Sequence, residues 1–91
     1  MYNTITIKEI TQQLDGTLHT EVDIERKDGS IVTVATISGW TEVTENGEKR
    51  LETDIHFNTH NLFQDDHFLD HIRKALRNME EYWREVQKQV K

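Results

Sequence analysis

Residues 69–90 have the sequence LDHIRKALRNMEEYWREVQKQV, in which apolar residues recur at alternating steps of three and four. This spacing places them along one side of an α-helix, because a helix turns once every 3.6 residues. The resulting seam consists of Leu69, Ile72, Leu76, Met79, Trp83, Val86 and Val90. Phe68, Ala75 and Tyr82 flank the seam and make it wider than the stripe of a two-stranded coiled coil. We therefore expect the helix to cover a sheet, with a direct helix–helix dimer as the alternative.

Polar residues before the seam predict where this helix begins. Asn61 and Gln64 have the three-residue spacing of a capping box, with Asn in place of Ser or Thr. Asp65 near the start and Lys88 near the end complement the helix dipole. The expected helix covers about residues 62–89.

Three Asx-Gly pairs, Asp15-Gly16, Asp28-Gly29 and Asn46-Gly47, divide the first part of the chain into β-like segments. Such pairs form tight hairpin turns because Gly and Asn tolerate positive φ. The expected strands cover about residues 3–14, 17–27, 30–44 and 48–57. Short turns make consecutive strands antiparallel neighbours. The predicted fold class is α+β, a single domain over residues 1–91. It has a four-stranded antiparallel β-meander in the order 1-2-3-4, with one long C-terminal amphipathic helix packed on one face.

The lengths of the turns decide which side of each strand the helix covers. A three-residue loop at 27–29 and a two-residue type I′ turn at 46–47 bring most apolar residues to one face. That face holds Leu18, Val22, Ile24, Val32, Val34, Trp40, Leu51, Ile55 and Phe57. In the first strand Ile5 and Ile7 have the opposite parity to Ile10 and Leu14, which predicts a bulge near residues 8–9.

The opposite face of the predicted sheet combines acidic rows with a mildly apolar strip. The strip would come from Ile31, Thr33, Ala35 and Ile37, between acids on the second and fourth strands. An apolar strip with a charged rim is typical of a protein-binding patch. The alternative is a central strand with β-branched residues on both faces. The predicted protein-binding residues are Glu21, Asp23, Glu25, Ile31, Ile37, Glu52 and Asp54.

The net charge of −6 belongs entirely to the predicted strands. Residues 1–60 contain 11 acids and 5 bases, whereas residues 61–91 contain 6 of each. This sign opposes direct binding to nucleic acid or to an anionic membrane and favours a basic protein surface as the partner. Spread over a domain about 30 Å across, the charge is roughly threefold too dilute to imitate duplex DNA.

Patterns typical of catalysis are not evident. The neighbouring acids Asp65-Asp66 and Glu80-Glu81 point in different directions on a helix, and neither a Gly-x-Ser-x-Gly motif nor a glycine-rich phosphate loop occurs. We therefore expect a non-enzymatic protein without a cofactor. With no cysteine, no signal peptide and no membrane span, the expected location is cytoplasmic.

Two histidine pairs have the i, i+4 spacing of helical zinc ligands, His56 with His60 and His67 with His71. The seam places His67 and His71 on the solvent side, where exposed polar residues are ordinary. No metal ligands are therefore assigned, and weak metal binding at the surface is the third function considered.

The leading hypothesis is a small acidic protein-binding module, acting as an inhibitor, adaptor or accessory subunit through the acidic sheet face. The alternative is a structural protein that forms a homodimer through a strand edge or the sheet face. In overall type, though in no specific motif, the chain resembles the small inhibitors and accessory proteins of phages and mobile elements, such as anti-defence proteins.

Overall fold

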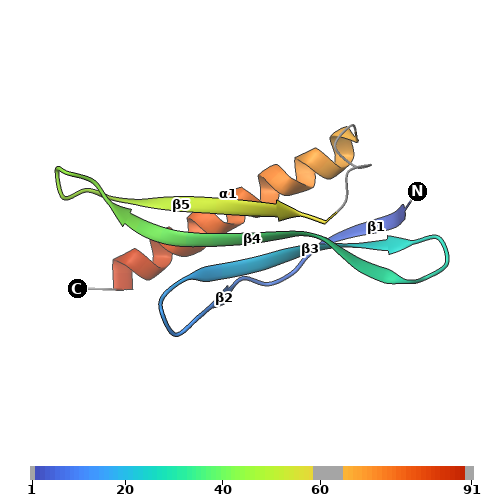
Figure 1. The fold of residues 1–91 in the computed structure, drawn as a ribbon, viewed down its shortest axis with the longest axis horizontal. Coiled ribbons are helices and arrows are strands. Elements are labelled where there is room, and N and C mark those ends of the chain that lie inside the picture. The colour runs from blue at the N-terminus through green and yellow to red at the C-terminus, as the bar shows by residue number, and fades with distance from the viewer. Residues whose placement is uncertain (1, 59–64, 90–91) are drawn as a thin grey trace.

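A computed structural model describes residues 2–58 and 65–89 and shows an antiparallel sheet with one long helix across one face (Figure 1). This arrangement confirms the predicted α+β class. The elements are β1 (Tyr2–Ile7), β2 (Thr11–Gln12), β3 (Leu18–Arg26), β4 (Ile31–Val43), β5 (Lys49–Phe57) and α1 (Asp66–Gln89).

The strands follow the predicted meander, in the order β1-β3-β4-β5, but the expected first strand is broken into two. Both pieces, β1 and β2, pair with β3, so the sheet has five strands rather than four. The break at residues 8–10 coincides with the predicted bulge. There the buried hydroxyl of Thr20 donates a hydrogen bond to the carbonyl oxygen of Lys8 at 2.7 Å. This bond satisfies a polar group that would otherwise be costly beneath the helix.

The three Asx-Gly turns share one geometry. In the last of them the Thr44 amide donates to the Glu48 carbonyl at 2.8 Å, and the Gly47 amide donates to the Thr44 carbonyl at 2.9 Å. The other two turns repeat these bonds, and each glycine has a φ between 82° and 90°. Each loop therefore has three residues and ends on a left-handed glycine. The prediction was right for 27–29 and wrong for 46–47, where Glu45 joins Asn46 and Gly47 in the loop.

A β-bulge in β4 changes which of its residues face the helix. The register with β3 runs from Ile24↔Val32 to Val22↔Ala35, which leaves Val34 as an extra residue. Beyond this point the odd-numbered residues of β4 lie on the helix side, since a one-residue insertion reverses the alternation. Ala35 and Ile37 are consequently buried, and Trp40 lies on the opposite face. The prediction had these three residues on the wrong sides.

The facing of β5 was nevertheless predicted correctly. The bulge reverses the second half of β4 once, and the longer loop after β4 reverses β5 relative to β4 once more. The two reversals cancel, so Leu51, Ile55 and Phe57 pack against the core as expected. The pairing itself is displaced by one residue, with Ile37 rather than Ser38 opposite Ile55.

Four residues on α1 form the centre of its contact with the sheet, namely Phe68, Ile72, Ala75 and Met79, all of them buried. Phe68 and Ala75 were expected at the flank, whereas the seam residues Leu69, Leu76 and Trp83 are only partly buried. The contact is centred here because Met79 packs directly onto Gly39 of β4.

Asp65 caps the helix at its N-terminus. Its carboxylate accepts the amides of His67 at 3.0 Å and Phe68 at 3.4 Å, which satisfies two of the free amides of the first turn. The predicted capping pair Asn61 and Gln64, like Val90 of the seam, lies outside the described residues.

Gly39 allows the close approach of the helix to the sheet. A Cβ at this position would lie 2.7 Å from Met79 Sδ and 3.1 Å from Leu51 Cδ1, closer than atoms of a packed core normally approach. We predict that Gly39→Ala lowers the free energy of unfolding by about 1–2 kcal/mol, the cost of overpacking less a small gain in strand propensity. Urea denaturation followed by circular dichroism measures this change. Ser38→Ala, next in sequence but on the other face, is the control and should stay within about 0.5 kcal/mol of the wild type.

The burial of side chains along α1 predicts which alanine substitutions in the helix destabilise the fold most. Phe68 is fully buried and meets Phe57 edge-on, with ring centroids 6.2 Å apart, whereas Leu76 is only partly buried. Phe68→Ala should therefore cost about 3–5 kcal/mol and Leu76→Ala about 1–2 kcal/mol, since the cost grows with the cavity left behind. Thermal and urea unfolding test this order. Equal losses for the two variants would contradict the placement of Phe68 at the centre of the contact.

Candidate protein-binding face

The face of the sheet opposite α1 is termed the open face. Its acidic side chains come from β3 and β5, where they alternate with core residues that point toward the helix. Six of the seven predicted binding residues lie on this face: Glu21, Asp23, Glu25, Ile31, Glu52 and Asp54. The seventh, Ile37, lies on the helix side and is completely buried because of the bulge at Val34, so it is not available to a partner.

A row of hydroxyl groups replaces the expected apolar strip along the middle of the open face. Thr36 lies opposite Glu21 of β3, and Ser38 lies opposite Asp54 of β5. Thr33 donates a hydrogen bond from its hydroxyl to Asp23 at 2.8 Å. On the open face of β4, exposed apolar side chains lie instead toward the strand's ends, at Ile31, which is 68 % exposed, and at Trp40, which is 37 % exposed.

Carboxylates outnumber cations on the open face. Two of its acids form ion pairs, Glu21 with Lys8 at 3.2 Å and Glu52 with Arg50 at 2.8 Å. All four side chains are partly or largely exposed, so each pair contributes little to stability and can be exchanged for a cation from another protein. Six carboxylates, those of the five predicted acids and of Glu42, exceed these two cations and leave the face with an acidic surplus.

The outer surface of α1 balances its own charges. Arg73 pairs with Asp70 at 2.6 Å, Arg84 pairs with Glu80 at 3.0 Å, and the third pair is Lys88 with Glu85. These pairs are three or four residues apart, where side chains on a helix meet. The strand region therefore carries the net charge of the protein, as the sequence indicated.

The protein is elongated, so its net charge per unit length is lower than in a compact domain of the same size. The described part of the chain has principal extents of 49, 23 and 17 Å, so its long axis exceeds the length of about 30 Å expected for a compact domain of this size. Six net charges along 49 Å amount to roughly one per 8 Å, against about one per 1.7 Å in duplex DNA. Charge density thus argues against imitation of a whole DNA surface.

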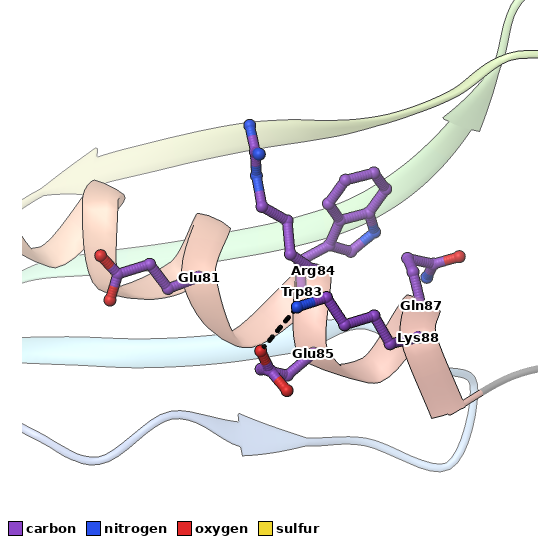
Figure 2. A pocket seen from close by; sticks show the side chains of 6 residues that line it. All are labelled: Glu81, Trp83, Arg84, Glu85, Gln87 and Lys88. Carbon is purple, nitrogen blue, oxygen red and sulfur yellow. Dashed lines mark hydrogen bonds and ion pairs between the residues drawn. The ribbon is translucent and has the colours of Figure 1, made fainter.

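Two shallow hollows occur beside α1, and neither resembles an enclosed ligand pocket. The first, of about 560 Å³, is formed by Glu81, Trp83, Arg84, Glu85, Gln87 and Lys88 and is open to solvent. Figure 2 shows that these side chains come from the last turns of the helix, with Lys88 and Glu85 joined by their ion pair. Two acids and two bases give it no net charge. The second, of about 480 Å³, lies between α1 and the β1–β2 break, with Ile10 and Tyr82 among its lining.

His67 and His71 lie together on the exposed side of α1, as the seam predicted. Their rings meet edge-on with centroids 4.6 Å apart, and His71 Nδ1 lies 2.9 Å from the carbonyl oxygen of His67. Two imidazoles supply only half of a tetrahedral zinc shell. Among residues 2–58 and 65–89, no group of three or more potential ligands is arranged to hold a metal ion. His60, the partner predicted for His56, lies outside these ranges.

Asp15 and Asp28 have clearly lowered pKa values, and both lie in turns. The Thr17 amide donates to Asp15 at 2.9 Å, and this bond is the main cause of the lower pKa of Asp15. At Asp28 the Ser30 hydroxyl, at 2.6 Å, is the main cause of the lower pKa, and the Ser30 amide adds to it. These carboxylates stabilise turns and have no arrangement suited to acid–base chemistry.

The pKa of Asp28 predicts a pH dependence of stability. Because the folded state lowers this pKa below 3.8, the ionised carboxylate stabilises the fold above pH 3.8, and the contribution disappears as the pH falls through the folded pKa. Asp28→Ala should therefore be less stable than the wild type at pH 7, and the two should converge toward pH 2. Urea denaturation across this range measures the difference. A gap that stays constant with pH would contradict a role for the ionised form.

Comparisons with protein family models, curated proteins and solved structures found no match to this chain. Within the described ranges, no helix has the length and apolar character needed to cross a membrane. The argument about function therefore depends on the surface of the protein itself.

Trp40 is the open-face residue that the sequence analysis misplaced. Its indole Nε1 donates a hydrogen bond to Glu42 Oε1 at 2.8 Å, and it lies directly opposite Glu52 of β5. The alternation along β4 alone assigns Trp40 to the core. The signal that could have placed it correctly is Gly39, because a glycine inside a strand often marks close approach of another element to that face.

Proposed function

We propose that this chain is a non-enzymatic protein-binding module that uses the open face against a basic protein surface. The observation that carries the proposal is the separation of charge between the two sides of the protein. The acids of β3 and β5 exceed the cations beside them, whereas the outer surface of α1 is balanced by its own ion pairs. Complementary potentials steer partners together and fix their orientation.

The hydroxyl row supports the same proposal. Thr36 and Ser38 are half-buried between the acidic rows and present short side chains, so a partner's lysine or arginine side chains can approach carboxylates from both strands. Interfaces of this kind are polar at the rim and use a few residues as anchors. An inhibitor, adaptor or accessory subunit that acts in the cytoplasm, of the type that phages encode against host defences, fits a small protein without cysteine.

Self-association through the sheet face or through an edge strand, β1 or β5, is the second function considered. β5 lies at one end of the strand order, so its outer edge can accept another strand. Antiparallel pairing of two copies centred on Thr53 would place Glu52 opposite Asp54 twice, and like charges in facing positions are destabilising. This register is therefore disfavoured, whereas pairing centred on Leu51 would place Arg50 opposite Glu52 and would be favourable.

The test of the proposed function compares two variants with equal change of charge. The open-face variant replaces Glu21, Asp23, Glu25, Glu52 and Asp54 with the corresponding amides. The control variant makes the same change at Asp66, Asp70, Glu80, Glu81 and Glu85 of α1. The wild-type chain, immobilised and exposed to a lysate of the cells that express it, should retain a basic protein that salt releases. The open-face variant should lose at least about tenfold in affinity for that protein, and the control variant should keep most of it, because each charged contact is worth about 0.5–1 kcal/mol or more.

Either of two results would refute the proposal. One is a retained partner that binds the open-face variant and the wild type equally well. The other is the absence of any salt-sensitive basic protein among those retained. Circular dichroism of both variants establishes that the fold is intact, since all ten substituted side chains lie outside the buried core.

A further inference from the structure

Trp40 is a large aromatic side chain that is partly exposed on the open face. It follows Gly39 on β4, lies across from Glu52 and remains 37 % exposed, although most large apolar side chains of the sheet are buried under α1. Tryptophan is the residue most enriched among those that dominate binding energy at protein interfaces. Because Trp40 has carboxylates as neighbours, a partner group that complements it would be planar, to stack on the ring, and positively charged.

Neighbouring residues of β4 and β5 define the surroundings of the indole. Glu42 accepts the Nε1 hydrogen of Trp40 at 2.8 Å, which restrains the ring and keeps a carboxylate at its edge. Glu52 faces Trp40 across the ladder, and Arg50 pairs with Glu52 at 2.8 Å. Asp54 lies one position further along the same face of β5, opposite Ser38. One carboxylate thus contacts the ring, and two further carboxylates and one arginine occupy nearby positions on the same face.

We propose that Trp40, with Glu42 and Glu52 beside it, is the site that receives an arginine side chain of the basic partner. A guanidinium is planar, weakly hydrated and able to stack on an indole while its N–H groups bond to carboxylates. A lysine ammonium is a compact, strongly hydrated charge that gains less from the same ring. Arg50 already shows that a guanidinium is bound by a carboxylate here. This inference rests on the proposed function and specifies the chemistry of the partner.

The experiment compares a short oligo-arginine peptide with an oligo-lysine peptide of the same length by calorimetry at low salt. The wild-type chain should bind the arginine peptide more tightly. Trp40→Ala should weaken binding of the arginine peptide about two- to fivefold, the size of a cation–π contact at a surface, and should weaken binding of the lysine peptide by a smaller factor. Trp83→Phe is the matched control, because it alters the other tryptophan of the chain and should keep the preference for arginine.

Fluorescence provides a measurement that does not require a change at Trp40. In the Trp83→Phe variant Trp40 is the only tryptophan, so the emission reports on this site alone. The arginine peptide should change the emission in proportion to binding, and the lysine peptide should change it much less.

The possible results distinguish the inference from the proposed function. Equal affinity for the two peptides, or an arginine preference that survives Trp40→Ala, overturns the role of Trp40. If the open-face amide variant then still loses both peptides, the proposed function stands without the arginine site. If neither peptide binds the wild type, or both bind the amide variant unchanged, the proposed function itself fails.

Discussion

The insertion of Val34 into β4 determines which side chains of the sheet are covered by α1. Before the bulge the even-numbered residue Val32 faces the helix, and after it the odd-numbered residues Ala35, Ile37 and Gly39 do. This shift brings a glycine beneath Met79, where any side chain would keep the helix away from the sheet. The same shift moves Trp40 to the opposite face. The packing of the core and the composition of the open face therefore depend on a single extra residue.

The two sides of the protein differ in how their charges are compensated. On α1, cations and carboxylates alternate at helical spacing and neutralise one another within the helix. On the open face, β3 and β5 contribute mostly acids, and the strand between them contributes hydroxyl groups. A sheet places residues of alternate parity on one face, so a short acidic pattern repeated on two strands becomes a continuous surface. This difference is the physical basis for assigning the binding role to the sheet.

Most of the architecture was predictable because it depends on local patterns. The spacing of Ile72 and Met79 identifies the helix without reference to distant residues. The three Asx-Gly pairs likewise identify the hairpins, and their glycines have positive φ in the structure. The face of the sheet on which each side chain lies was less predictable, because a single extra residue between two turns reverses the alternation. The unrecognised bulge placed Ile37 and Trp40 on the opposite faces from those predicted. The misjudged loop length after β4 compensated for this error, so the faces of β5 were predicted correctly. The acids of β3 were placed correctly because no irregularity separates them from Val22 and Ile24.

The hairpin formed by β4 and β5 extends past the C-terminal end of α1 (Figure 1). From Trp40 to Arg50 nearly every residue is exposed, and Trp83 reaches its inner end through a hydrogen bond to Thr41 at 2.8 Å. A two-stranded ribbon without cover buries little apolar surface and is only marginally stable by itself. Its amide protons should therefore exchange with solvent through local fraying, whereas exchange at Ala35 and Ile37 should require global unfolding. The tip of this hairpin can in this way change its shape without loosening the core.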